Sequence, residues 1–335
     1  MSSKEKIIKV TEYTSLCNNE ALYSPNGKYI ASSNQADDYI ELRDANTCKN
    51  LFMLYGHSNY ANSMSFSPNS EYIVSGSNDR TLIIWNTSNG KQISKLLGHT
   101  GPVNSVAYSP DGNRIISGSN DKYIIIWNAD GKLLSRLEKQ SSRIKFVTFS
   151  PDGNQIVSLS QNSKIRIWDT CTEKHLYDLE NTKDVSSVSF SPDGKTIVGG
   201  QYNNICIWNY YDGKLLLMLK DNSTINYVSF LLDTNYIVST NDACKICIWD
   251  LTSRTIIFSI RKDWFIYSLS LCPNEHDILI TSITCCIYKN LKILNWITRK
   301  KYATFLSTLK KLEALNAIAK VFQCQQLQRV ICSFI

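Results

Sequence analysis

The sequence of 335 residues has no long apolar run and contains little glycine or proline. Glycine occurs 14 times and proline 7 times, while 43% of the residues are apolar, which excludes a disordered or collagen-like chain. No stretch of about 18 consecutive apolar residues is present, so we expect no membrane-spanning helix. The opening MSSKEKIIKVTEY lacks the apolar centre of a secretory signal. We therefore expect a globular protein of the cytoplasm, with the nucleus as the alternative.

Signatures of common enzymes and metal sites are also missing. The sequence contains no phosphate-binding G-x-x-x-x-G-K-[ST], no G-x-G-x-x-G after a strand and no H-E-x-x-H. Its 11 cysteines are scattered, odd in number and often beside isoleucine in apolar runs, as expected of free thiols in a reducing compartment. Cys244 and Cys247 have a C-x-x-C spacing, but no second pair follows, so we predict that they pack in the core. We predict no enzymatic activity, no metal, no cofactor and no small-molecule substrate.

The strongest positive signal is a repeat of about 41 residues. Five tryptophans follow one another at intervals of 42, 41, 40 and 41 residues: Trp85, Trp127, Trp168, Trp208 and Trp249. An upstream aromatic residue keeps the same spacing: Phe66, Tyr108, Phe149, Phe190 and Phe230. The turns SPNS or SPDG follow the first four of these aromatic residues. Extending the register in both directions gives seven units.

Within each unit the apolar residues alternate with a period of two, which is typical of short strands separated by turns. Residues 103–137 contain VNSVAYSP, RIISGS, YIIIWN and KLLSRL, which predict four strands in one unit. Four strands repeated seven times predict an all-β, seven-bladed β-propeller of four-stranded antiparallel blades over residues 1–297. The expected repeats cover 14–55, 56–97, 98–138, 139–179, 180–219, 220–260 and 261–297. Residues 5–13 are expected to supply the closing strand of the last blade.

Two segments carry a family resemblance. GHSNYANSMSFSPNSEYIVSGSNDRTLIIWN (56–86) and GHTGPVNSVAYSPDGNRIISGSNDKYIIIWN (98–128) resemble the WD-repeat family along their whole length. The resemblance implies a buried hydrogen-bonded relay in each of these blades, formed by His57, Ser75, Asp79 and Trp85, and by His99, Ser117, Asp121 and Trp127. A Ser/His/Asp set is also found in hydrolases. Its repetition at one period, without a nucleophile elbow, favours a structural role.

The resemblance also implies a binding surface on the rim of the central channel, three and five residues after each relay-histidine position and just before the turn aspartate. On this surface we expect a peptide or protein partner that carries an acidic side chain, because aromatic and arginine side chains are common interface anchors. A merely solvated rim is the alternative. The expected partner-binding residues are Tyr60, Asn62, Asn78, Asn104, Asn120, Arg143, Lys145, Phe265 and Tyr267.

The last part of the sequence differs from the repeats. Residues 289–335 contain nine basic residues and one acidic residue, and the apolar positions from Tyr302 to Ile318 follow a helical period. We therefore expect a basic, amphipathic, short α-helical C-terminal extension over 298–335. It could dock on the propeller, or act as the helical part of a substrate-recruiting adaptor of a ubiquitin ligase or another complex. It could also bind an anionic membrane surface or nucleic acid. We do not expect nucleic acid to be the main partner.

Overall fold

The computed structural model describes residues 9–13, 20–33, 38–231, 233–261, 268–271, 278–281 and 285–288. All of them belong to one of the chain's two compact units, Lys9–Lys289. Every regular element in these ranges is a β-strand, which confirms the predicted all-β architecture. In the same ranges no helix is long and apolar enough to span a membrane. The expected helical extension, 298–335, lies outside the described residues.

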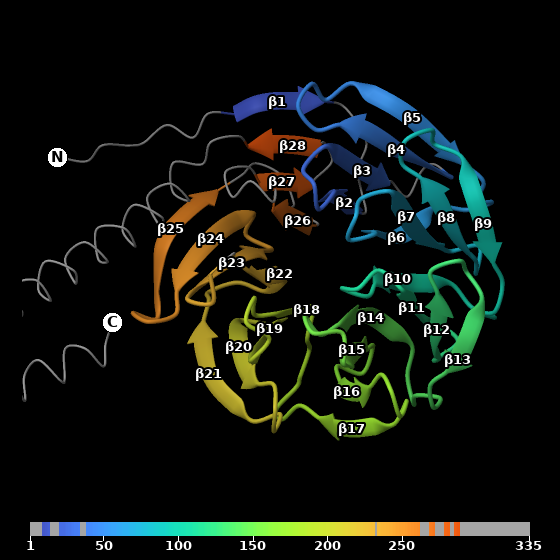
Figure 1. The fold of residues 1–335 in the computed structure, drawn as a ribbon. Helices are drawn as coiled ribbons and strands as arrows, with labels where there is room; N and C mark the ends of the chain where they lie inside the picture. The colour runs from blue at the N-terminus through green and yellow to red at the C-terminus, as the bar shows by residue number, and fades with distance from the viewer. Residues whose placement is uncertain are drawn as a thin grey trace, which may run out of the picture. The chain divides into compact units, whose positions relative to one another are not determined.

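Strands β2 to β25 pair into six four-stranded antiparallel sheets, each built from four strands in chain order. We call these sheets blades 1 to 6. In Figure 1 they follow one another around a common centre, with the first strand of each blade innermost and the fourth outermost. Blade 1 contains β2 (Glu20–Tyr23), β3 (Tyr29–Ser33), β4 (Tyr39–Asp44) and β5 (Asn50–Tyr55); blade 2 contains β6 (Ala61–Phe66), β7 (Tyr72–Ser77), β8 (Leu82–Asn86) and β9 (Gln92–Leu96); blade 3 contains β10 (Val103–Tyr108), β11 (Arg114–Ser119), β12 (Ile124–Asn128) and β13 (Leu133–Arg136). Blade 4 contains β14 (Ile144–Phe149), β15 (Gln155–Ser160), β16 (Ile165–Asp169) and β17 (His175–Asp178); blade 5 contains β18 (Ser187–Phe190), β19 (Thr196–Gln201), β20 (Asn204–Asn209) and β21 (Leu215–Lys220); blade 6 contains β22 (Ile225–Phe230), β23 (Tyr236–Asn241), β24 (Lys245–Asp250) and β25 (Thr255–Arg261).

A further four-stranded sheet joins the two ends of this unit. Its strands are ordered β1 (Lys9–Tyr13), β28 (Cys285–Tyr288), β27 (Ile278–Thr281) and β26 (Ser268–Leu271). β1 runs antiparallel to β28, with Lys9 opposite Tyr288 and Tyr13 opposite Cys285. The outermost strand of this sheet therefore comes from the beginning of the unit and the other three come from its end.

The core lies between neighbouring blades. In blades 2 and 3 the second and third strands are buried on both faces, because each blade is covered by the next on one side and by the previous one on the other. This explains why the third strands, LIIWN and IIIWN, are apolar runs and depart from the predicted alternation with a period of two. The tryptophans of the repeat belong to these layers: Trp85 packs with residues of blade 1, and Trp127 with residues of blade 2.

Hydrogen bonds also connect the innermost strands of successive blades. The Ser63 hydroxyl accepts from the Val106 amide at 3.3 Å, and the Ser105 hydroxyl accepts from the Val147 amide at 3.1 Å. In blade 1 the same position holds Glu20, whose Oε2 accepts from the Met64 amide at 2.6 Å. Side chains of the inner strands therefore fix the stagger between neighbouring blades, and with it the positions of the loops at their ends.

Candidate functional site

The four relay residues of blade 2 form one hydrogen-bonded set. His57 Nε2 lies 2.8 Å from the Ser75 hydroxyl, and His57 Nδ1 lies 3.0 Å from Asp79 Oδ2. The Trp85 indole nitrogen donates to the same Ser75 oxygen at 2.8 Å. Both imidazole nitrogens and the indole N–H therefore have partners inside the blade.

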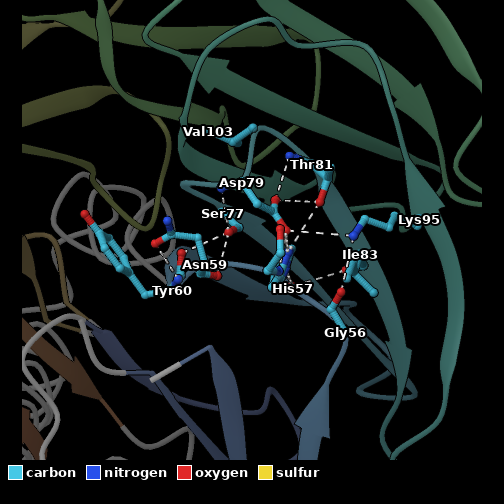
Figure 2. Close-up of polar contacts among 12 residues, drawn as sticks. Gly56, His57, Asn59, Tyr60, Ser77, Asp79, Thr81, Ile83, Lys95 and Val103 are labelled. Atoms are coloured by element: carbon cyan, nitrogen blue, oxygen red, sulfur yellow. Dashed lines mark hydrogen bonds and ion pairs between the residues drawn. The ribbon is translucent and has the colours of Figure 1, made fainter. Parts of the chain in front are cut away.

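Asp79 is the polar centre of this set, as Figure 2 shows. Its Oδ1 accepts from the Thr81 hydroxyl at 2.6 Å, and its Oδ2 accepts from the Ser58 amide at 3.0 Å. Burial alone would raise the pKa of Asp79, but the hydrogen bonds from His57 and Thr81 outweigh it and lower the pKa below its usual value. Lys95 adds a cation 3.8 Å from Oδ2. The carboxylate is therefore ionised at neutral pH.

Blade 3 repeats the arrangement almost atom for atom. His99 Nδ1 lies 2.8 Å from Asp121 Oδ2, His99 Nε2 lies 2.8 Å from the Ser117 hydroxyl, and Trp127 donates to Ser117 at 2.9 Å. Burial would raise the pKa of Asp121, but the hydrogen bond and the charge of His99 lower it to about 2. Ser75 and Ser117 are both 0% exposed, so neither hydroxyl can reach a substrate. The geometry is suited to holding a blade together and not to acyl transfer.

The relay also positions the loop before the innermost strand. In blade 2 the Tyr60 carbonyl accepts from the Asn78 amide at 3.1 Å and from the Ser77 hydroxyl at 3.0 Å. Together with the Ser58–Asp79 bond, these contacts hold the segment from His57 to Tyr60 against the turn that carries Asp79. Tyr60 itself is turned away from the relay, on the side opposite Lys95 (Figure 2). A rim loop is therefore rigidly attached to the relay.

Three of the expected rim residues bridge neighbouring blades. The side-chain amide of Asn62 donates to the Val103 carbonyl at 2.9 Å, and the side-chain amide of Asn104 donates to the Ile144 carbonyl at 2.6 Å. Lys145 Nζ lies 3.5 Å from the Val185 carbonyl in the same register. The resemblance implied a place for these residues beside the channel, but it gave no indication that their donors point to the next blade.

The other expected rim residues are placed differently. Asn120 accepts from Asn104 at 2.9 Å, which ties two of them together. Within the ranges that the structure describes, neither the Tyr60 hydroxyl nor the exposed Arg143 guanidinium has a hydrogen-bond partner. Phe265 and Tyr267 lie outside those ranges. Among the expected rim residues that the structure describes, the side chains of Tyr60, Asn78 and Arg143 therefore remain available to a partner.

Comparison with known families agrees with this geometry. The model described as the IFT122 first beta-propeller matches residues 84–294, which is more than half of the chain. The model described as WD domain, G-beta repeat, matches residues 48–86. The chain belongs to the WD-repeat β-propeller family. No curated protein is similar enough to the chain to count as a match. Membership of the WD-repeat family supports a general role as a protein-interaction scaffold, and such propellers are generally non-catalytic.

Blades 4 and 6 of this WD-repeat protein keep the bond from tryptophan to serine without a histidine. In blade 4, Gln140 stands in the histidine position and donates to the Ser158 hydroxyl at 3.2 Å, while Trp168 donates to the same oxygen at 2.9 Å. In blade 6, Trp249 donates to Ser239 at 2.9 Å. The sequence shows that Gln140 stands where blades 2 and 3 have a histidine. That its side chain can replace one contact of the imidazole follows only from the geometry.

The prediction that Cys244 and Cys247 both pack in the core of this WD-repeat unit is confirmed for Cys247 and is wrong for Cys244. Cys206 and Cys247 are buried in β20 and β24, and burial raises the pKa of each thiol to about 11. Cys244 lies in the preceding turn and is partly exposed, so the C-x-x-C pair does not converge on one point. Across the described segments, no group of three or more His, Cys, Asp or Glu residues could hold a metal ion.

Proposed function

We propose that this WD-repeat protein is a non-catalytic scaffold that binds a peptide or protein partner on the rim formed by the loops before the innermost strands. The observation that supports this most directly is that Tyr60, a side chain available to a partner, lies on a rigidly held loop. Tyr60 lies on a loop held by the relay through Ser58, and its carbonyl accepts from the Ser77 hydroxyl and the Asn78 main-chain amide. A pre-ordered anchor loses little conformational entropy when a partner binds.

The charge of the neighbouring rim favours an acidic partner. Arg143 and Lys145 are both exposed at the start of β14, and Arg143 lies on a loop fixed by the Gln161 amide, which donates to its carbonyl at 2.8 Å. Arginine can bind a carboxylate through two parallel hydrogen bonds. An Asp or Glu side chain on the partner, next to an apolar contact with Tyr60, is the expected mode of binding.

We further propose that the sheet containing β1 is the seventh blade and closes the propeller. β26 would then be its innermost strand. The Tyr23 amide donates to the Ser270 hydroxyl at 3.2 Å. This repeats the bond from the Tyr108 amide of blade 3 to the Ser65 hydroxyl of blade 2. Closure would cover the faces of blades 1 and 6 that otherwise lack a neighbouring blade.

The rim proposal is tested with the double substitution Tyr60→Ala and Arg143→Ala in the full chain. The matched control is Tyr211→Ala with Lys214→Ala, which removes an exposed aromatic residue and a cation from a turn of blade 5. We expect affinity capture from cell extract to lose its specific partners with the rim variant and to keep them with the control. An unchanged partner set would overturn the proposal. Loss of partners only on truncation after Trp296 would assign recognition to residues 297–335.

A further inference from the structure

A cavity of about 400 Å³ lies between blades 2 and 3, at the opposite end of the inner strands from Tyr60. Its walls include Tyr72 of blade 2 and Tyr108 of blade 3, and the aliphatic side chain of Ile93. Asp111 and Asp130, both exposed, contribute carboxylates. The residues that line the cavity include no lysine or arginine.

The equivalent space between blades 3 and 4 is occupied by a cation of the chain itself. The Arg114 guanidinium carbon lies 5.8 Å from the centre of the Phe149 ring, and its Nη2 donates to the Gly153 carbonyl at 3.2 Å. An arginine over an aromatic ring with a carbonyl acceptor is a favourable arrangement. This contact shows how the repeat accommodates a guanidinium between two blades.

The cavity contains the same frame without the arginine. Tyr72 stands 42 residues before Arg114, at the same strand position. Tyr108 and Gly112 stand 41 residues before Phe149 and Gly153, and both line the cavity. Between blades 3 and 4, an aromatic ring and a glycine receive Arg114. The same two positions are repeated between blades 2 and 3, where no lysine or arginine lines the cavity.

A small residue keeps the cavity open. Ala129, two residues after Trp127, lines the cavity. Two residues after Trp208, the same position in blade 5 holds Tyr210, whose ring packs 5.2 Å from Phe190 and occupies the corresponding space. The volume between blades 2 and 3 thus follows from the absence of a side chain that another repeat supplies.

The polar groups around the cavity suit a cation. Hydrogen bonds from Ser109 and the Asn113 amide lower the pKa of Asp111, so its carboxylate is charged at neutral pH. Tyr108 is 8% exposed, and within the described ranges its hydroxyl has no hydrogen-bond partner. The hydroxyl oxygen keeps some contact with solvent and is available to accept a hydrogen bond from a ligand.

We propose that this cavity binds an arginine side chain of a protein partner, with the guanidinium held by Tyr108, Asp111 and Asp130. The site is separate from the rim proposed above, because a six-residue inner strand of roughly 20 Å lies between Tyr60 and the turn that follows Phe66. Each end of the inner strands then has its own recognition chemistry: the rim takes an acidic side chain and the cavity takes a basic one.

The test uses N-acetyl-arginine methylamide as the probe, titrated into the ¹⁵N-labelled full chain and followed by backbone amide shifts. The neutral isostere N-acetyl-citrulline methylamide is the matched ligand. We expect saturable shifts around Tyr108 and Asp130 with the arginine probe, and binding of the citrulline probe about tenfold weaker because a charge-assisted contact is lost. Equal affinity for the two probes, or no saturable binding of either, would overturn the proposal.

Two variants localise the binding. Ala129→Tyr supplies the side chain that fills the space in blade 5 and should abolish the shifts. Asp130→Asn should weaken binding several-fold, while Asp212→Asn, the same change of charge in a turn of blade 5, should leave it unaltered. Unchanged affinity in both Ala129→Tyr and Asp130→Asn would contradict the assignment. Because the rim variant Tyr60→Ala with Arg143→Ala should retain arginine binding, failure of either proposal is distinguishable from failure of the other.

Discussion

The Trp208 indole nitrogen donates to the Glu180 carbonyl at 2.7 Å, whereas Trp85 donates to a serine hydroxyl of its own blade. The difference arises at Gly199, which stands where the other blades have that serine. A Cβ on Gly199 would lie 2.8 Å from the Trp208 ring, so the glycine and the shifted indole depend on each other.

We expect Gly199→Ala to lower the free energy of unfolding by about 1–3 kcal/mol, because the added methyl group has no space beside Trp208. Denaturant unfolding of the full chain measures this cost. In a Trp208→Phe background the smaller ring should relieve most of it. A cost that is the same in both backgrounds would show that the Trp208 ring is not what excludes the methyl group.

Ser75→Ala should destabilise blade 2 by about 1–3 kcal/mol, since it leaves the Trp85 N–H and one His57 nitrogen buried without a partner. Ser88→Ala, in the exposed turn after β8, is the matched control and should change stability by less than about 0.5 kcal/mol. Thermal unfolding of the two variants compares them directly. Equal melting temperatures would show that the relay does not contribute to the stability of the protein.

Acid should weaken the relays. Asp121 has a pKa of about 2 in the folded protein, below the value of about 3.9 expected in the unfolded chain. Its stabilisation is therefore complete above about pH 4 and is lost as the pH falls toward about 2. Unfolding measured across this window should show a smaller dependence on pH in Asp121→Asn than in the unchanged chain. Identical slopes would contradict the assignment.

Glu20 should have the opposite effect. Burial raises the pKa of this carboxyl group to about 7, although the hydrogen bonds from Met64 and Ser63 act against the rise. Because the folded pKa is above the unfolded one, its favourable contribution is complete below about pH 4.3 and is lost as the pH rises through about 7. Glu20→Gln should therefore be more stable than the unchanged chain at pH above 7, with the exposed Glu71→Gln as control. Lower stability of Glu20→Gln there would contradict the raised pKa.

Much of the fold could be predicted because each repeat carries its own local signals. The spacing of Trp85 and Trp127 and the turns after Phe66 and Tyr108 located strands and blades, since strand alternation and turn chemistry act over a few residues. His57 is 18 positions from Ser75 and 22 from Asp79 in sequence, so local signals do not group them. Their grouping was predicted from the family resemblance.

Contacts between blades could not be predicted in the same way. Whether Asn62 faces the channel or the Val103 carbonyl depends on the stagger of two blades, which no single repeat encodes. The cavity beside Ala129 likewise results from the combined volumes of side chains about 40 residues apart. Periodicity fixes which positions are equivalent, while the side chains that fill or leave each gap are set by packing.

The pairing of β1 with β28 has a consequence for synthesis of the chain. Lys9 and Tyr288 are opposite each other in the sheet but 279 residues apart in sequence. At about 5–20 residues per second, the ribosome needs roughly 14–56 s to make the intervening segment. During this interval β1 has been synthesised and its partner strand does not yet exist. The earliest strand of the unit is thus the last to be paired, and nascent chains are open to edge-to-edge association with one another until translation has passed Tyr288.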